Sequence, residues 1–196
     1  MARDPAQLAL FGDEPPRPSP MPDGFESRSD VISAGEERAL VERFATLPFR
    51  NFEFQGFLGK RRTVSFGFRY DFSERALHDA AAMPEFLMPL REAAAVFGRV
   101  ASEALVHALV TEYTPGAGIG WHRDRPEFGV VIGVSLLSAC VIRFRRRAAR
   151  GFERASFLAE PRSAYRLDGP VRTEWEHSIA GVDALRYSVT FRTRRA

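Results

Sequence analysis

Apolar positions recur at helical spacing in two early segments of the chain. After a Ser33–Glu36 pair with capping-box spacing, the apolar residues of segment 35–47 fall on one helical face. The sequence therefore predicts a helix over 35–47 that Pro48 ends, and a second amphipathic helix over 84–101.

Alternating patterns, typical of strands, dominate the rest of the chain. Residues 50–70 are rich in aromatic residues at every second position and predict two strands around a turn at Leu58-Gly59-Lys60. Further strands are predicted over 105–113, 130–137, 140–145, 163–167, 173–178 and 184–193, with turn residues between them. Helices followed by many short strands predict an α+β fold whose body is an antiparallel sandwich or barrel.

Composition divides the chain into a tail and one domain. Residues 1–24 hold six of the 13 prolines and are predicted to be a flexible tail, and residues 25–196 are predicted to form a single domain. One cysteine, Cys140, excludes an intramolecular disulfide and a cysteine-based zinc cluster. Because no apolar run reaches membrane-spanning length and no secretory signal begins the chain, we expect a cytoplasmic protein.

Charge is distributed unevenly between the two halves of the chain. Residues 122–196 hold 15 basic and 8 acidic side chains, a net charge of +7, whereas the whole chain has a net charge of +3. A basic second half suits a polyanionic partner such as nucleic acid. A general preference for arginine, without functional meaning, would produce the same bias.

Three residues could together hold a metal ion. His122 and Asp124 form a His-x-Asp pair after a glycine-rich loop, and His177 lies on a later predicted strand. Two imidazoles and one carboxylate on one side of a metal are the facial set of non-haem Fe(II) oxygenases. Alone, a His-x-Asp pair is also common in surface loops.

The final predicted strand alternates strictly between two kinds of side chain. Arg186, Ser188, Thr190 and Arg192 share one face, while the other face is apolar. If the apolar face packs on the core, the two arginines lie inside a barrel, where a small dicarboxylate could neutralise them. The alternative is an exposed edge strand with both arginines in water.

These motifs occur together in an order that resembles a known family. The segments Tyr113-Thr114-Pro115-Gly116, Trp121-His122-Arg123-Asp124, Val134-Ser135-Leu136-Leu137, His177 and Arg186–Arg192 resemble the bacterial AlkB-like Fe(II)- and 2-oxoglutarate-dependent dioxygenases. The resemblance covers roughly residues 105–195. It implies a double-stranded β-helix, or jelly roll, over residues 105–196, with helices and a substrate lid over residues 25–104.

The resemblance also implies a role for each residue of the site. His122, Asp124 and His177 would bind Fe(II). Tyr113, Arg186, Ser188 and Arg192 would hold the cosubstrate 2-oxoglutarate, and dioxygen would complete the reaction. In this family the reaction removes N-methyl groups as formaldehyde while 2-oxoglutarate becomes succinate.

Candidate substrate contacts are less specific. A damaged base must be single-stranded or flipped to reach such a site. Arg61, Arg62, Phe68 and Tyr70 lie where the family has its lid, whereas Phe66 is expected in the core. Arg143, Arg145 and Arg147 alternate on one strand face and could contact phosphates or protect a sheet edge.

The tail contains a short apolar motif. Gln7, Leu8, Leu10 and Phe11 resemble the Gln-Leu-x-Leu-Phe peptide by which bacterial repair proteins dock on the DNA sliding clamp. The alternative is that this cluster folds back on the domain.

The preferred hypothesis is an oxidoreductase that dealkylates damaged nucleic acid, most simply in DNA repair. Two alternatives remain at this point: the same chemistry acting on a protein, as a demethylase or hydroxylase, and a jelly-roll binding module without catalysis.

Overall fold

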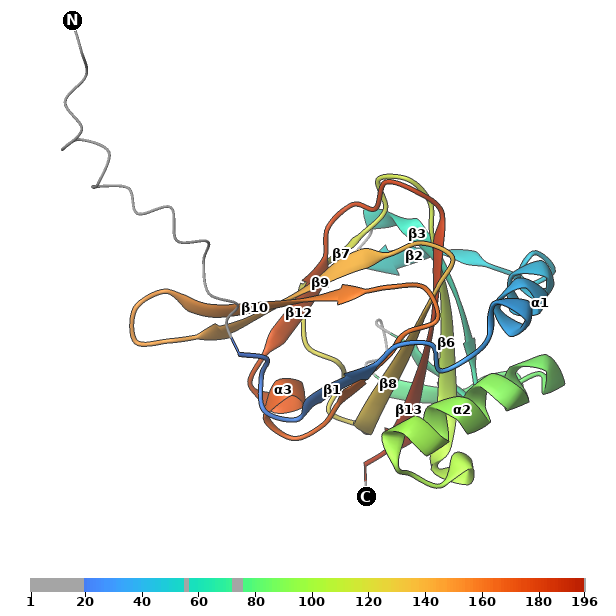
Figure 1. Ribbon diagram of the computed structural model, residues 1–196, viewed down its shortest axis with the longest axis horizontal. Coiled ribbons are helices and arrows are strands. Elements are labelled where there is room, and N and C mark those ends of the chain that lie inside the picture. The colour runs from blue at the N-terminus through green and yellow to red at the C-terminus, as the bar shows by residue number, and fades with distance from the viewer. Residues whose placement is uncertain (1–19, 55–56, 72–75, 196) are drawn as a thin grey trace, which may run out of the picture.

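Two β-sheets form the body of the protein, with the first two α-helices together on one side of it and the third apart from them beside the first strand (Figure 1). A computed structural model describes residues 20–54, 57–71 and 76–195. The helices are α1 (Ala34–Phe44), α2 (Met88–Gly98) and α3 (Pro170–Thr173), with 3-10 turns η2 (Glu85–Leu87) and η3 (Ser102–Ala104). The strands are β1 (Phe25–Arg28), β2 (Arg50–Phe54), β3 (Phe57–Phe66), β4 (Phe68–Asp71), β5 (Ala76–Asp79), β6 (Leu105–Tyr113), β7 (Ile119–His122), β8 (Phe128–Leu136), β9 (Cys140–Arg147), β10 (Phe152–Ala159), β11 (Ala164–Leu167), β12 (Glu176–Ile179) and β13 (Arg186–Arg194).

The strands form a larger and a smaller sheet that are the two walls of a jelly roll. The major sheet has the order β1-β11-β8-β13-β6-β3-β2, and the minor sheet has the order β10-β9-β12-β7. A separate ribbon pairs β4 with β5. The neighbouring strands in these sheets run antiparallel to one another. The expected α+β class and double-stranded β-helix are confirmed.

Two apolar cores lie on opposite faces of the major sheet. One core joins α1 and α2 to the apolar face of β13, with Phe44, Leu90 and Phe191 fully or almost fully buried. The other fills the space between the two sheets and includes Phe144 of β9 and Leu167 of β11. Because both faces of the major sheet are covered, the polar side of β13 is buried as well as its apolar side.

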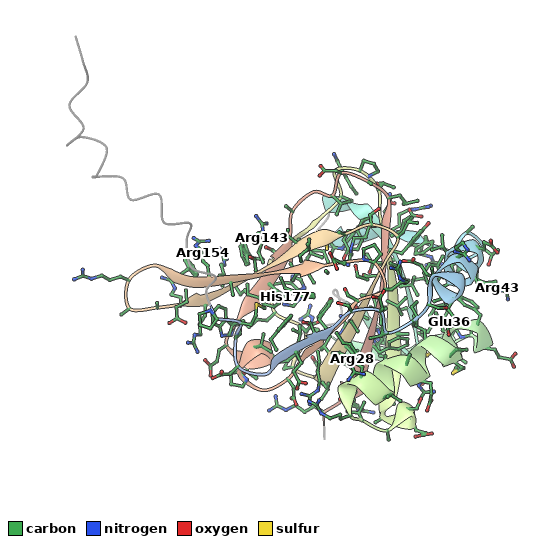
Figure 2. The ribbon with its side chains drawn as sticks, in the orientation of Figure 1. Arg28, Glu36, Arg43, Arg143, Arg154 and His177 are labelled. Atoms are coloured by element: carbon green, nitrogen blue, oxygen red, sulfur yellow. The ribbon has the colours of Figure 1, made fainter. Side chains whose placement is uncertain are left out.

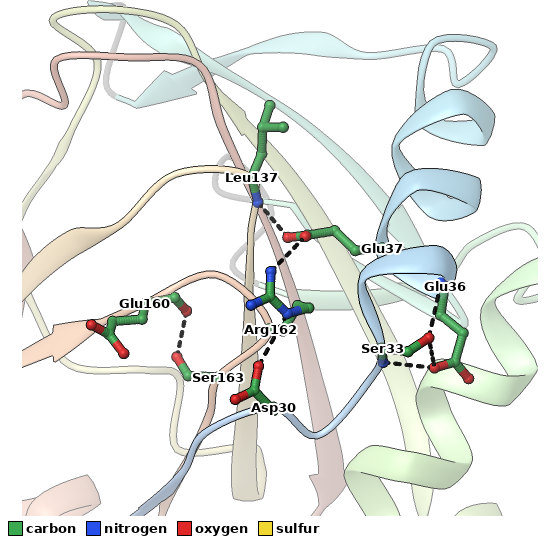
Figure 3. A network of polar contacts seen from close by, with 8 residues as sticks. All are labelled: Asp30, Ser33, Glu36, Glu37, Leu137, Glu160, Arg162 and Ser163. Carbon is green, nitrogen blue, oxygen red and sulfur yellow. Dashed lines mark hydrogen bonds and ion pairs between the residues drawn. The ribbon is translucent and has the colours of Figure 1, made fainter.

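Helix α1 is fixed to the major sheet by a buried carboxylate (Figure 3). The predicted capping box is present, because Ser33 Oγ accepts from the Glu36 backbone N–H while Glu36 accepts from the Ser33 N–H. Glu37, only 8% exposed, accepts from the Leu137 N–H at 2.8 Å and from Arg162 at 3.2 Å. Leu137 is in the left-handed region at φ +72°. The carboxylate thus ties the helix to two separate loops.

Several predicted boundaries are wrong. The first helix begins at Ala34 and ends at Phe44, and the second ends at Gly98 because Arg99 adopts φ +53°. Segment 58–60 is not a turn but lies within β3. Residues 55–56, between β2 and β3, lie outside the described residues. The strand predicted over 173–178 begins only at Glu176, after α3.

Four strands have no counterpart in the sequence-based prediction: β1, β5, β7 and β10. In β10 the inward positions include two alanines, Ala155 and Ala159, while outward Leu158 is 53% exposed. Small residues inside and a large one outside remove the alternation that predicts a strand.

Segment 64–70 is broken rather than continuous. Gly67 separates β3 from β4 at φ +77°, and a Cβ there would lie 2.0 Å from the Val106 carbonyl oxygen. Phe66 therefore enters the core, as expected, while Phe68 starts the β4–β5 ribbon. Among the described residues, no helix is long and apolar enough to cross a membrane.

Candidate active site

Two histidines meet on the inner face of the minor sheet. Strands β7 and β12 are antiparallel neighbours, and His122 is paired in register with His177. Their ring centroids are 4.2 Å apart. Burial, and then the neighbouring His122, lower the pKa of His177 to about 3, so this imidazole is neutral at neutral pH and free to act as a ligand. Figure 2 labels His177.

Asp124 lies beside this pair. Strand β7 ends at His122, so the carboxylate comes from the chain that follows the strand. Asp124 Oδ2 is 3.7 Å from His177 Nε2. Burial alone would raise the pKa of Asp124, but Arg192 and the other nearby basic groups outweigh it and hold that pKa below its ordinary value. The side chain is therefore an ionised carboxylate.

The three side chains are neighbours, but they are not arranged as metal ligands. Within the part of the chain that the structure describes, no group of three His, Cys, Asp or Glu side chains could hold a metal ion as it stands. The His122 ring nitrogen Nδ1 lies 2.9 Å from the Gly120 carbonyl oxygen. Joint ligation therefore requires side-chain adjustment, while the donor types, imidazole and carboxylate, suit a divalent transition metal.

The polar face of β13 lies between the sheets. Because β13 is central, between β8 and β6, the alternative of an exposed edge strand is wrong. Arg186 is fully buried, and Ser188 is 4% exposed. Arg186 Nη2 donates to Ser135 Oγ at 3.1 Å, and its guanidinium carbon lies 4.9 Å from the centre of the Tyr113 ring.

Arg186 has unused hydrogen-bonding capacity. Its Nε and Nη1 atoms are buried and have no hydrogen-bond partner among the residues that the structure describes. An unsatisfied buried N–H costs about 1–3 kcal/mol, more when the group is charged. A guanidinium fork with free N–H groups fits a carboxylate, so the geometry can bind the end of a small dicarboxylate.

Arg192 lies closer to the histidines. Its Nη2 and Nε donate to Asp124 Oδ1 at 2.8 and 3.2 Å, and Nη1 lies 3.2 Å from His107 Nδ1. No motif in the sequence singles out His107 as part of the site. Its position on the β6 face that also carries Tyr113, at even spacing, is the signal that could have placed it here.

Another arginine, which the sequence does not mark as part of the site, holds the segment that follows Asp124. Arg172 of α3, 8% exposed, donates to the backbone carbonyls of Arg125, Phe128 and Gly129 at 2.6–2.9 Å. No periodic pattern marks this residue, because a single turn of helix carries it.

The structure separates the predicted substrate residues. Arg61 lies on the side of β3 near Gly118, whose carbonyl oxygen accepts from it at 3.3 Å, and burial lowers its pKa while Tyr113 opposes this. Arg62 is on the other side and forms a bidentate ion pair with Glu112 at 2.7 and 3.0 Å. That pairing holds β3 against β6 and directs Arg62 away from the site, which corrects the expectation for this residue.

The aromatic candidates lie on the separate ribbon. Phe68 is partly buried, with the Arg194 guanidinium carbon 5.8 Å from its ring centre. Tyr70 pairs with Leu77 in the ribbon, and its side chain lies outside the described part of the structure. Gln7, Leu8, Leu10 and Phe11 lie outside the described residues altogether.

Comparisons with known proteins agree with this architecture. Residues 31–192 match the family model described as the 2OG-Fe(II) oxygenase superfamily. The solved structure of OsALKBH1 superposes with a TM-score of 0.65 at 15% identity, covering 90% of this chain and 99% of that one. A prolyl-4-hydroxylase of Pseudomonas putida superposes with a TM-score of 0.56 at 16% identity, covering 88% and 94%.

A curated relative matches over a shorter region. The uncharacterized protein L905 of Acanthamoeba polyphaga mimivirus is 34% identical over 73 residues, which are 36% of this chain and 34% of the relative. The chain thus spans about a third of the length of that relative. The structural matches show the fold, and the family match, which covers more than half of the chain, shows the family and its cofactors Fe(II), 2-oxoglutarate and dioxygen. The chain belongs to the 2OG-Fe(II) oxygenase superfamily and is a 2-oxoglutarate- and Fe(II)-dependent dioxygenase.

Proposed function

We propose that this dioxygenase removes alkyl groups from damaged bases of DNA. The observation that carries the catalytic part is Arg186, a buried cation on the inner face of the barrel with two nitrogen atoms that have no partner among the described residues. The nucleic-acid part rests on the net charge of +7 in residues 122–196 and on the fold shared with OsALKBH1.

The residues present fit the two groups that the family requires. His122, Asp124 and His177 offer two imidazoles and an ionised carboxylate, the donor set for Fe(II). Tyr113, Arg186 and Ser188 line the place where the far carboxylate of 2-oxoglutarate would bind, with Arg186 supplying the charge. Bound iron, with 2-oxoglutarate and dioxygen, supplies the oxidation of the alkyl carbon.

The other residues position this set. Arg192 holds one oxygen of Asp124 and leaves the other turned toward His177. Arg172 fixes the loop that follows Asp124. Because these cations are themselves buried, the carboxylate stays ionised without water around it.

The test is mass spectrometry of a single-stranded oligonucleotide that carries 1-methyladenine and 3-methylcytosine. It is incubated with the protein, Fe(II), ascorbate and 2-oxoglutarate, with His122→Ala as the matched variant. We expect loss of methyl mass with the wild type only. Succinate formation without methyl loss would move the substrate to a protein, and neither product from folded, iron-loaded protein would favour a binding module.

The tail supports a separate proposal for the partner. The similarity of Gln7, Leu8, Leu10 and Phe11 to a clamp-docking peptide fits a repair enzyme that is brought to DNA by the sliding clamp. A pulldown with purified clamp tests it, with Leu10→Ala/Phe11→Ala as the variant that should no longer bind.

A further inference from the structure

Four arginines gather on the outer face of the minor sheet, opposite the face that carries the histidines. Arg143, Arg145 and Arg147 alternate along β9, and Arg154 of the neighbouring strand β10 lies directly opposite Arg145. We call these four residues the arginine stripe. Figure 2 labels two of them, Arg143 and Arg154, on the outer side of the β9–β10 hairpin.

The position of β9 excludes protection of a sheet edge as the reason for its three outward arginines, whereas Arg154 lies on the edge strand β10. Strand β9 has β10 on one side and β12 on the other, so it is an interior strand. Its backbone is already paired on both sides and needs no charge to repel another strand. Of the two sequence-based interpretations, contact with phosphates is the one that remains.

The stripe is hardly neutralised by the protein itself. On this face Glu176 pairs with Arg145 at 2.6 Å. The exposed side chains of Arg143, Arg147 and Arg154 have no carboxylate partner within the described parts of the chain. Like charges directly opposite each other on neighbouring strands are destabilising. The chain therefore maintains an unfavourable pairing that a bound polyanion would relieve.

Arg146, the next residue in the same strand, shows the contrast. It points to the other side of β9 and is paired with Glu153 at 2.8 Å and with Glu174. Its positive charge is thus satisfied within the fold. The shortage of acidic neighbours, with Glu176 alone paired to the stripe among the described residues, is a property of the outer face and not of β9 as a whole.

Aromatic rings lie between the arginines of the stripe. The guanidinium carbons of Arg143 and Arg145 are 5.3 and 4.4 Å from the ring centre of Trp121. Phe152 has the guanidinium carbons of Arg145, Arg147 and Arg154 at 4.7, 5.6 and 5.7 Å. Flat cations interleaved with rings offer both phosphate contacts and stacking surfaces for unpaired bases.

The stripe is connected to the site by the edge strand of the sheet. Trp121 precedes His122 in β7, which is the edge strand, so the two side chains alternate to opposite faces. A nucleic-acid strand on the outer face can therefore pass over β7 toward the histidines on the inner face.

We infer that the arginine stripe, with Trp121 and Phe152, binds the backbone and unpaired bases of single-stranded DNA that flanks the reacting base. This inference rests on the proposed function, since it places the flanking part of the same substrate. The charge of the stripe and the rings within it favour single-stranded DNA over an acidic protein, which would use the charges alone.

The test measures binding separately from catalysis. Fluorescence anisotropy follows a labelled, unmodified 20-nucleotide thymidine strand with the full chain, without iron or 2-oxoglutarate, at several salt concentrations. The test variant is Arg143→Gln/Arg154→Gln. Its matched control is Arg38→Gln/Arg43→Gln, which removes the same charge from exposed positions of α1, where Figure 2 shows Arg43 far from the stripe.

We expect the test variant to bind on the order of tenfold more weakly at about 0.1 M salt, and the control to bind like the wild type. The slope of log K against log salt should fall by about 1.4, because each single-strand phosphate contact contributes about 0.7. Equal effects of the two variants would overturn the inference, as would a poly-glutamate peptide that competes as well as the DNA strand.

Demethylation of a methylated trinucleotide, which has few flanking phosphates and bases for the stripe to bind, reports mainly on the proposed function. If the trinucleotide reacts and the test variant binds DNA normally, only the stripe is refuted. If no oligonucleotide is demethylated but the stripe variant loses binding, only the dealkylation is refuted.

Discussion

Replacing Arg186 by methionine should make the protein more stable and at the same time unable to use its cosubstrate. The side chain is fully buried, and two of its N–H groups have no partner while its charge remains. Methionine is unbranched, flexible and apolar, so it occupies the aliphatic part of the space without the unsatisfied donors, although it is shorter than arginine. The substitution thus removes the free-energy cost of a buried, partly unpaired guanidinium, which in the wild type only a bound anion offsets.

The size of the gain follows from the contacts. Two unsatisfied buried donors cost about 4 kcal/mol together, at roughly 1–3 kcal/mol each. The substitution also loses the bond to Ser135 and the contact with the Tyr113 ring, each about 1 kcal/mol. A net gain of about 2 kcal/mol should raise the Tm by about 4–8 °C for a chain of this size, measured by calorimetry without 2-oxoglutarate.

Cosubstrate use should fall steeply in the same variant. Two hydrogen bonds between a guanidinium and a carboxylate contribute about 3–6 kcal/mol, so the KM for 2-oxoglutarate should rise at least about 100-fold. Succinate production at varied 2-oxoglutarate measures this. The stabilisation of the wild type by 2-oxoglutarate should also disappear.

Arg172→Met is the matched control. Like Arg186, this arginine is buried, but it donates to three backbone carbonyls. The same replacement should therefore lower the Tm. If Arg186→Met is destabilising to a similar degree and leaves the KM unchanged, the assignment of Arg186 to the cosubstrate is wrong.

Three further predictions concern other parts of the molecule. Burial and then Arg192 lower the pKa of His107 from 6.5 to about 3, so the unfolded chain binds a proton that the folded one does not, and stability is lost as the pH falls from 6.5 toward 3. His107→Gln should therefore flatten that loss by about 1.4 kcal/mol per pH unit in urea titrations between pH 4 and 7, and an unchanged slope would contradict the buried neutral state. Glu37→Ala should lower the unfolding free energy by about 1–3 kcal/mol because the Leu137 N–H loses its acceptor, whereas Glu37→Gln keeps an acceptor and should cost less in the same measurement. Asp124→Ala should abolish iron-dependent succinate formation while circular dichroism stays that of the wild type, and substantial residual turnover would mean that the ligands are misassigned.

The sequence predicts those parts of the fold in which alternation or capping is local. The strand over 105–113 is confirmed as β6, and the polar face of the last strand is confirmed as an interior face. Strand β10 was not predicted because its inner side is made partly of alanines. The turn after β2 was predicted at the wrong place because the strand pattern continues through Gly59.

The sequence indicates candidate site residues but not the partners that those residues contact in the fold. A resemblance of motifs is enough to bring His122 and His177 together as candidates, and the structure pairs them in register. The opposite orientation of Arg61 and Arg62 depends on the pairing of β3 with β6, which no local pattern encodes. The same holds for Arg172, whose three acceptors, in the loop after Asp124 and at the start of β8, lie more than forty residues earlier.

The central place of β13 has a consequence for how the protein folds. This strand, the last one described, pairs with β6 and β8, so the major sheet stays in two halves until it arrives. Joining such distant segments costs loop-closure entropy before any contact is gained, which makes this step slow. Because β13 also carries Arg186 and Arg192, the interior acquires its anion-binding charges only as the sheet closes. The two histidines of the site, which lie on the minor sheet, can pair without β13, but the arginines that would bind an anion reach the interior only when the major sheet is complete.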